Sequence, residues 1–147
     1  MTLVDALAGV KRLYLDSAPV IYHVEAVLAY QAKMDKVFQE VVAGRLTAVT
    51  GPVTLAECLV QPFRDGDLSL VQKFEDVITN AANTEFISID QSATKAAELR
   101  AKYQLALLDA LQVATALAAN CDALLTNDFG LKPVTEIPVL ILDELTI

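Results

Sequence analysis

Short apolar segments alternate along this chain with longer segments of helical periodicity, and this alternation restricts the possible folds more than any other feature. Apolar runs such as "LYL" and "VLIL" present nonpolar side chains to both faces of a strand, so both faces of the resulting sheet must be covered. We therefore expect an α/β protein, a three-layer α/β/α sandwich with a central, mostly parallel five-stranded sheet. The predicted strands are 12–16, 45–50, 85–89, 122–126 and 139–142.

The predicted helices occupy the intervals between these strands. Ser17 is a candidate N-cap for the first of them, and Pro62 is expected to end or kink a later one. The predicted helices are 17–25, 25–43, 53–63, 69–82, a segment capped by Asp90 that runs to about Tyr103, and 107–120.

The composition indicates a single domain over residues 1–147. Hydrophobic residues make up 54% of the chain and charged residues 20%, which is enough for a core with a surplus for a partner surface. Cys58 and Cys121 lie in apolar segments and are expected to be buried free thiols. Neither a signal peptide nor a run long enough to span a bilayer is visible. We therefore expect a cytoplasmic protein with no membrane contact.

The net charge argues against a nucleic-acid partner. It is −8 at pH 7, and the sequence pI is about 4.5. Proteins that bind phosphate backbones normally carry a basic surface. Any proposal of RNA binding must therefore account for this acidic balance.

Four carboxylates nevertheless form a suggestive set. Asp16 and Asp128 follow two of the predicted strands, and Glu57 and Asp109 lie near the starts of two predicted helices. In a parallel sheet, ligands bind beyond the carboxyl ends of the strands. Asp109 and Glu57 also have apolar neighbours, so both are expected close to the core, where an acid needs a partner.

Each acid also has a local explanation. Asp16 fits an ordinary loop position, and Thr54 with Glu57 matches a capping box. Asp109 is favoured by the positive end of its helix, and Asp128 in "TNDFG" suits a turn. Taken singly, these structural roles are sufficient.

If the four acids converge, a cation must neutralise them. Two like charges about 4 Å apart repel by roughly 4 kcal/mol at an effective dielectric constant of about 20. Oxygen ligands without His or Cys suit Mg²⁺ or Mn²⁺, which keeps several waters and takes one or two carboxylates directly. We expect Asp16 and Asp109 as direct ligands, with Glu57 and Asp128 acting through water or at a second metal ion.

The motifs "YLDSAPVIY", "TLAE", "LLDALQVATAL" and "LLTND", in this order, resemble those of the PIN-domain nucleases. Within that family the chain is most similar to the VapC-type toxin ribonucleases. The resemblance extends from Leu13 to about Leu142 and implies a PIN-like sandwich that cleaves single-stranded RNA with Mg²⁺ or Mn²⁺. It assigns the acidic cluster to Asp16, Glu57, Asp109 and Asp128, with supporting roles for Ser17 and for Thr126 or Asn127.

The resemblance also implies partners. Toxins of this type are paired with an antitoxin protein that occupies a groove near the site, and the apolar surplus suits that contact or a homodimer. Tyr30, Met34 and Phe38 recur at helical spacing and are candidates for the groove, although most of such a stripe belongs in a core. Arg64 and Lys132 are weak candidates for contact with the RNA backbone. His23, the one histidine, is expected to have a structural or surface role rather than a catalytic one.

Other functions remain open from the sequence. A PIN nuclease that is not a toxin would carry the same acids. Another Mg²⁺-dependent phosphoryl hydrolase, such as a phosphatase or phosphoacceptor domain, would want a lysine near the site, and Lys132 follows a glycine loop instead. In a non-catalytic protein-binding module, the acids would serve only as caps.

Overall fold

A computed structural model describes residues 1–90 and 92–147 of the chain. Its five strands form one sheet in the order β3-β2-β1-β4-β5, and all four neighbouring pairs are parallel. The predicted α/β sandwich is confirmed, with a sheet that is wholly rather than mostly parallel. The strands are β1 (Arg12–Leu15), β2 (Thr47–Thr50), β3 (Thr84–Phe86), β4 (Ala123–Thr126) and β5 (Val139–Ile141).

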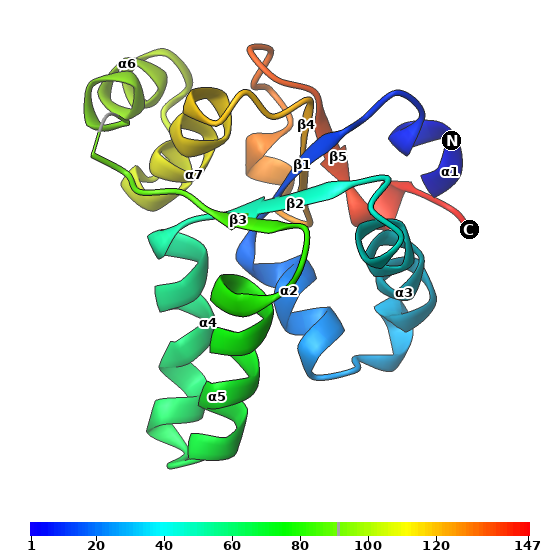
Figure 1. The fold of residues 1–147 in the computed structure, drawn as a ribbon. Coiled ribbons are helices and arrows are strands. Elements are labelled where there is room, and N and C mark those ends of the chain that lie inside the picture. Colours follow the sequence, from blue (N-terminus) through cyan, green and yellow to red (C-terminus); the bar gives the residue numbers. More distant parts are fainter. Residues whose placement is uncertain (91) are drawn as a thin grey trace.

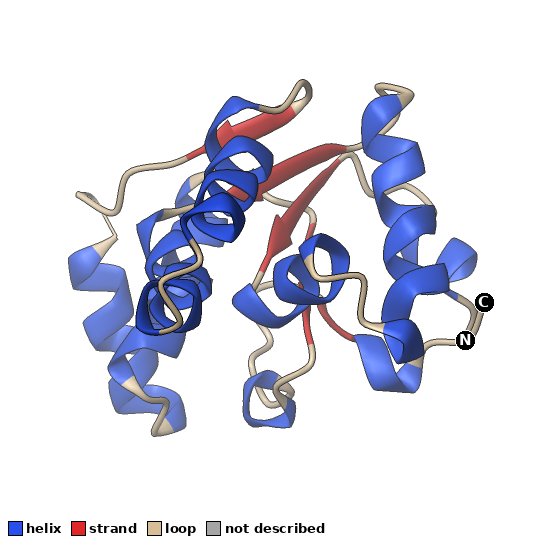
Figure 2. Cartoon of the chain, turned by 90° about the horizontal axis from the view of Figure 1, so that it is seen from below, coloured by secondary structure: helices blue, strands red, loops and turns tan. Residues whose placement is uncertain are grey.

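Helices cover both faces of this sheet (Figure 1, Figure 2). Successive side chains of β1 point to opposite faces, so Leu13 and Leu15 pack beneath the second and third helices, whereas Tyr14 packs with the last two. This two-sided burial explains the continuously apolar strands. The helices are α1 (Leu3–Leu7), α2 (Ser17–Val24), α3 (Leu28–Val42), α4 (Pro52–Arg64), α5 (Leu68–Glu75) with a π-helical turn (Asp76–Asn80), α6 (Ala93–Tyr103) and α7 (Leu107–Ala118).

The predicted helix over 25–43 is wrong at its N-terminal end. α2 ends at Val24 and α3 begins only at Leu28, because Ala26 adopts a left-handed conformation with φ of 50°. A residue in that region cannot continue a right-handed helix. α1 was not predicted, because its five residues are too few to show helical periodicity.

α4 ends at Arg64, one residue beyond the predicted segment 53–63. Pro62 does not end this helix, because it lies in the last turn, where its missing N–H removes a single intrahelical bond. The start of another predicted helix is wrong. The helix predicted after Asp90 begins at Ala93, with Ser92 rather than Asp90 at its N-cap. Gln91, which that prediction included, lies outside the described residues.

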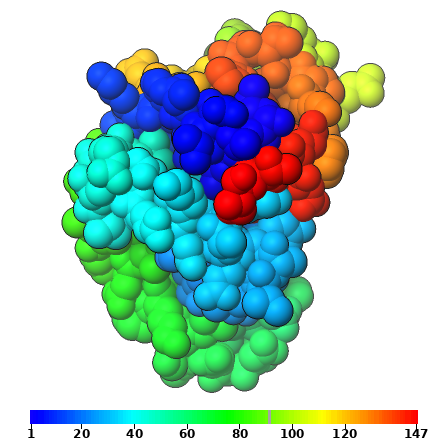
Figure 3. All heavy atoms as spheres, turned by 90° about the vertical axis from the view of Figure 1, so that its right-hand side faces the viewer, coloured from blue at the N-terminus to red at the C-terminus, as the bar shows by residue number. Residues whose placement is uncertain are grey.

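The first and last residues of the chain lie side by side (Figure 3). Thr2 and Thr146 form a parallel bridge, and the backbone N–H of Leu3 donates to the carbonyl of Thr146 at 2.7 Å. The Leu3 side chain is fully buried in the same core as β1. α1 is therefore an integral part of the folded unit.

Both cysteines are free thiols, as predicted, and Cys58 is buried while Cys121 is half-buried. Burial raises the pKa of the Cys58 thiol to about 12, so it stays protonated and unreactive near neutral pH. Across residues 1–90 and 92–147, none of the helices combines the length and the apolar character that crossing a membrane requires.

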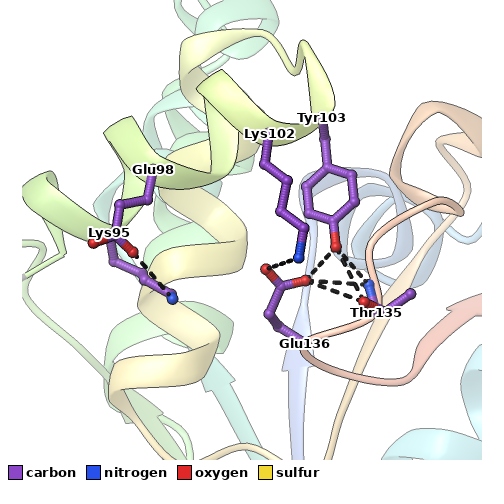
Figure 4. A network of polar contacts seen from close by, with 6 residues as sticks. All are labelled: Lys95, Glu98, Lys102, Tyr103, Thr135 and Glu136. Atoms are coloured by element: carbon purple, nitrogen blue, oxygen red, sulfur yellow. Dashed lines mark hydrogen bonds and ion pairs between the residues drawn. The ribbon is translucent and has the colours of Figure 1, made fainter.

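A polar network joins the end of α6 to the segment before β5 (Figure 4). The Tyr103 hydroxyl donates to the Glu136 carboxylate and lies 3.1 Å from the Thr135 hydroxyl, and Lys102 forms an ion pair with Glu136 at 3.5 Å. The Tyr103 hydrogen bond is the main cause that lowers the pKa of Glu136. The network fixes a long loop against α6.

We predict that Tyr103→Phe lowers the free energy of unfolding by about 1 kcal/mol, because it leaves Glu136 without its hydroxyl donor. Lys95→Ala is the control, since the Lys95–Glu98 pair in the same view is an exposed ion pair within one helix, for which no measurable loss is expected. Urea unfolding measures both. Equal effects of the two substitutions would contradict the prediction.

Candidate active site

The carboxyl ends of β1 and β4 bring two of the four acids to one edge of the sheet. β1 and β4 are parallel neighbours with Leu15 opposite Leu125, and the backbone N–H of Asp16 donates to the Leu125 carbonyl at 3.0 Å. Asp16 directly follows β1, and Asp128 lies two residues beyond the end of β4. The parallel register therefore places both acids at the same end of the sheet.

Asp16 is buried, with 8% of its surface exposed, and is held by donors on both oxygens. Oδ1 accepts from the Ser17 backbone N–H at 2.8 Å and from Gln112 Nε2 at 3.2 Å, and Oδ2 accepts from the Thr126 hydroxyl at 2.7 Å. These bonds offset the loss of hydration of a buried carboxylate. Asp16, not Ser17 as predicted, is the N-cap of α2, and Ser17 is the first helical residue.

Glu57 lies in α4 and is exposed, so the prediction that it sits close to the core is wrong. Its Oε1 accepts a hydrogen bond from the Ser17 hydroxyl, which links it to the Asp16 turn. The predicted capping box does not form. Gly51 is the N-cap of α4, and the Thr54 hydroxyl donates instead to the Leu15 carbonyl at 2.9 Å. Glu57 is therefore not explained by helix capping.

Asp109 lies in the first turn of α7 and is half-buried. Burial is the main cause that raises its pKa to about 6, and the charges of Asp128, Asp16 and Glu57 raise it further. Each of the other three acids thus lies within electrostatic reach of Asp109. The structure brings together all four carboxylates that the sequence singled out.

Asp128 combines a local role with its place in this cluster. It is exposed, and its Oδ1 accepts from the Gly130 backbone N–H at 2.8 Å, which caps a short 3-10 turn. Its own backbone N–H donates to the Thr126 hydroxyl at 3.0 Å. Thr126 is fully buried and therefore connects Asp16 with the backbone of Asp128.

The side chain of Asn127 makes its hydrogen bonds with partners other than the four carboxylates. Its amide nitrogen donates to the hydroxyls of Tyr22 and Tyr30 at 3.2 and 3.1 Å, and its Oδ1 accepts from the Asp143 backbone N–H at 2.9 Å. The two tyrosine rings are stacked 3.9 Å apart. Of the two candidates for the polar residue before the last acid, Thr126 lies in the site, and Asn127 anchors the loop.

The two basic candidates lie outside this network of contacts. Arg64 is exposed in the last turn of α4, seven residues and about two helical turns beyond Glu57. Lys132 forms an ion pair with Glu144 at 2.7 Å. His23 stacks on Phe38 with ring centroids 3.7 Å apart, and burial lowers its pKa, in keeping with a structural role.

Sequence reasoning missed Gln112, Thr54 and Tyr14. Gln112 Nε2 donates to the Thr54 hydroxyl at 2.8 Å as well as to Asp16, and its Oε1 accepts from the Tyr14 hydroxyl. A signal was present: Gln112 lies three residues after Asp109, on the same face of a helix that is otherwise mostly apolar.

The donor set fits a hard divalent cation that retains water. Carboxylates supply the charged oxygens, with hydroxyl and amide groups behind them. Among residues 1–90 and 92–147, no three His, Cys, Asp or Glu side chains already enclose a point where an ion would sit. An ion bound directly by one or two carboxylates and otherwise by water needs no such cage, and this is the preference of Mg²⁺.

Residues 13–136 match the PIN domain family. The chain is a PIN domain protein. The family predicted from the four sequence motifs is thereby confirmed. Nucleases of this family generally use divalent metal ions, which agrees with the donor set of this PIN domain. None of the curated proteins compared with the chain matches it.

Solved structures share the fold at low sequence identity. One is VapBC2 from Rickettsia felis bound to a promoter DNA fragment: the matching chain is 18% identical in sequence, with a TM-score of 0.68. The match covers 88% of this chain and 98% of the Rickettsia felis chain. A chain of a toxin–antitoxin complex from Klebsiella pneumoniae is 21% identical with a TM-score of 0.63, and the match covers 88% of this chain and 97% of that one. Mycobacterium tuberculosis VapC20, a toxin that cleaves the sarcin–ricin loop, is 12% identical with a TM-score of 0.65, and the match covers 86% of this chain and 98% of that one.

The raised pKa of Asp109 predicts a gain in stability when its charge is removed. A carboxyl group whose pKa rises on folding to about 6 destabilises the folded state once it ionises, so stability falls as the pH rises from about 4 through 6. We expect Asp109→Asn in EDTA to raise the free energy of unfolding at pH 7.5 by about 1 kcal/mol, after allowance for solvent screening.

The same substitution should change stability little at pH 4, where Asp109 is already protonated in the folded protein. Urea unfolding at both pH values measures the difference. A loss of stability of similar size at both would show that Asp109 serves packing rather than the acidic cluster.

Proposed function

We propose that this PIN domain is a Mg²⁺- or Mn²⁺-dependent endoribonuclease that hydrolyses phosphodiester bonds of single-stranded or loop RNA, and that it is the toxin of a type II toxin–antitoxin pair. The proximity of the four carboxylates carries the proposal: Ser17 links Glu57 to the Asp16 turn, Thr126 links Asp16 to Asp128, and Asp109 lies close enough to feel the charges of all three. Membership of the PIN family and a fold shared with toxin structures support it. The proposal treats residues 1–147 as one catalytic domain.

In this proposal Asp16 and Asp109 hold the metal ion directly, and Glu57 and Asp128 act through water or at a second ion. When bound, the ion lowers the pKa of its water and stabilises charge on the phosphate oxygens. Asp16 is suited to direct binding because donors on both oxygens already fix its carboxylate.

The supporting side chains orient the acids. Thr126 holds Asp16 by its hydroxyl and receives the backbone N–H of Asp128, so one side chain sets the spacing of two acids. Ser17 similarly links Glu57 to the turn of Asp16. No histidine base is needed, which agrees with the stacking of His23 on Phe38.

The acidic balance of the chain limits the substrate that we propose. With a net charge of −8, long-range attraction to RNA is weak, and the positive charge at the scissile phosphate must come from the metal ion. Arg64 is the better of the two basic candidates for backbone contact, because Lys132 is paired with Glu144. Recognition then depends on a defined RNA structure, and we propose a particular loop as the target.

We also propose an antitoxin protein as partner, and a homodimer. Two of the structures that share the fold come from toxin–antitoxin systems, one of them a toxin–antitoxin complex. An open surface hollow of about 510 Å³ offers partly apolar surface for such a contact, and the Val42 side chain within it is exposed. The hollow is lined by His23, Asp35, Phe38, Gln39, Val42 and Ala43. Met34, a groove candidate, is fully buried and belongs to the core.

The alternative functions fit the site less well. A phosphoacceptor domain would want a free lysine near Asp16, whereas Lys132 is paired with Glu144. A binding module in which the acids are only caps does not account for Glu57, which caps no helix and is linked to the Asp16 turn through Ser17. A PIN nuclease that is not a toxin shares the proposed chemistry and differs only in its partner.

We predict that Asp16→Asn lowers the rate of RNA cleavage more than about 100-fold, since even outer-shell partners of metal sites are often worth 10- to 100-fold. Asp35→Asn is the matched control, because it removes the same charge from an exposed position in α3. Cleavage of total RNA, mapped by sequencing, measures both. Equal rates for the two variants would refute the assignment of Asp16.

We further predict that EDTA abolishes cleavage and that Mn²⁺ or Mg²⁺ restores it. The affinity for Mn²⁺, measured by the paramagnetic resonance of the free ion, should fall at least about 10-fold in Asp109→Asn. Asp35→Asn again serves as control. Cleavage that persists in EDTA would exclude the proposed chemistry.

A further inference from the structure

Gln112 is a buried amide on the helix that carries Asp109. It lies in α7, is 1% exposed, and has buried apolar neighbours at Ala110, Val113 and Ala114. Residues three apart on a helix share a face, so Gln112 and Asp109 point toward the same side of α7. A buried amide is unfavourable unless its hydrogen bonds are made, so the partners of Gln112 decide its role.

The amide oxygen and both N–H groups of Gln112 form hydrogen bonds. Its Oε1 accepts from the Tyr14 hydroxyl, and its Nε2 donates to the Thr54 hydroxyl at 2.8 Å and to Asp16 Oδ1 at 3.2 Å. The partners come from β1, from α4 and from the turn that follows β1. Gln112 therefore joins α7 to β1, to α4 and to Asp16 itself.

The network also fixes the direction of the amide. The Thr54 hydroxyl donates its one proton to the Leu15 carbonyl at 2.9 Å, so it can only accept a hydrogen bond from Gln112. If the amide turned over, its oxygen would face the lone pairs of Thr54 and the carboxylate of Asp16. Donor and acceptor accounting thus requires that the N–H group faces Asp16.

We propose that Gln112 is a positioning residue of the nuclease site, which holds the Asp16 carboxylate at a set orientation relative to Asp109 and thereby sets the affinity for a divalent cation. The inference rests on the proposed function for the reaction, but its first readout is ion binding. It adds a residue that touches neither substrate nor metal ion and acts through Asp16.

The test compares Gln112→Met with Thr115→Val. Met has a similar size and no amide, so it removes the bond to Asp16. Thr115 is also fully buried in α7, but its hydroxyl donates to the Leu111 carbonyl within the helix, so its loss leaves Asp16 untouched. Urea unfolding in EDTA reports any loss of stability in either variant.

We expect the Kd for Mn²⁺, from the paramagnetic resonance of the free ion, to rise about 10-fold or more in Gln112→Met and to stay unchanged in Thr115→Val. Excess Mn²⁺ should then restore RNA cleavage by Gln112→Met, and it should not restore cleavage by Asp16→Asn. Wild-type affinity for Mn²⁺ in Gln112→Met would overturn the proposal and leave Gln112 a structural residue.

Thr54→Val decides the question if Gln112→Met does not fold, because it removes the acceptor that helps to orient the amide. A raised Kd for Mn²⁺ supports positioning, and an unchanged Kd overturns it. The same experiments test the proposed function separately. If the wild-type protein binds Mn²⁺ but cleaves no RNA, the nuclease function is refuted, and the role of Gln112 in ion binding is not. Wild-type protein that binds no Mn²⁺ would overturn both.

Discussion

The burial of carboxyl groups close to other acids is the constraint on which the arrangement of this site depends. Its cost is visible at Asp109, where burial, and after it the charges of three neighbouring acids, raise the pKa to about 6. The surrounding polar groups are arranged around this cost rather than around core packing. Gln112, Thr126 and the backbone N–H of Ser17 all direct donors at Asp16, the acid that is most deeply buried. The fold thus stabilises one acid with fixed dipoles and leaves the other acids available for the divalent cation that we propose.

The parallel sheet makes this arrangement possible. Because β2, β1 and β4 are neighbours and run in the same direction, the chain leaves each of them at the same edge, where α2 and α4 begin. Asp16 caps α2, so the positive end of a helix adds to its donors. Glu57 lies farther along α4 and reaches the site from an exposed position through Ser17. The result is a graded site, with a buried anchor at Asp16 and more hydrated acids around it.

The sequence predicted what depends on local pattern. Asp16 and Asp128 stood out because polar residues follow apolar runs, and the strands stood out because both faces are buried. It did not predict what depends on distant contacts. Gln112 is 98 residues from Tyr14 and 58 from Thr54, so its network appears only after folding. The role of Asn127 depends in the same way on Tyr22 and Tyr30. The boundary between α2 and α3 was predicted at residue 25, but the later start of α3 at Leu28 depends on the left-handed backbone angle of Ala26, which the helical pattern does not reveal.

The placement of the tyrosines has an optical consequence. The chain has four tyrosines and no tryptophan, so its near-ultraviolet signal arises chiefly from Tyr14, Tyr22, Tyr30 and Tyr103. Tyr22 and Tyr30 stack on each other, and both hydroxyls accept hydrogen bonds from Asn127, the residue before Asp128. The Tyr14 hydroxyl donates a hydrogen bond to Gln112, whose amide holds Asp16. Three of the four chromophores are thus coupled to the loop or the network that carries the acids. The protein thus contains its own spectroscopic probe of this region, and circular dichroism or fluorescence can report on the proposed ion binding without any attached label.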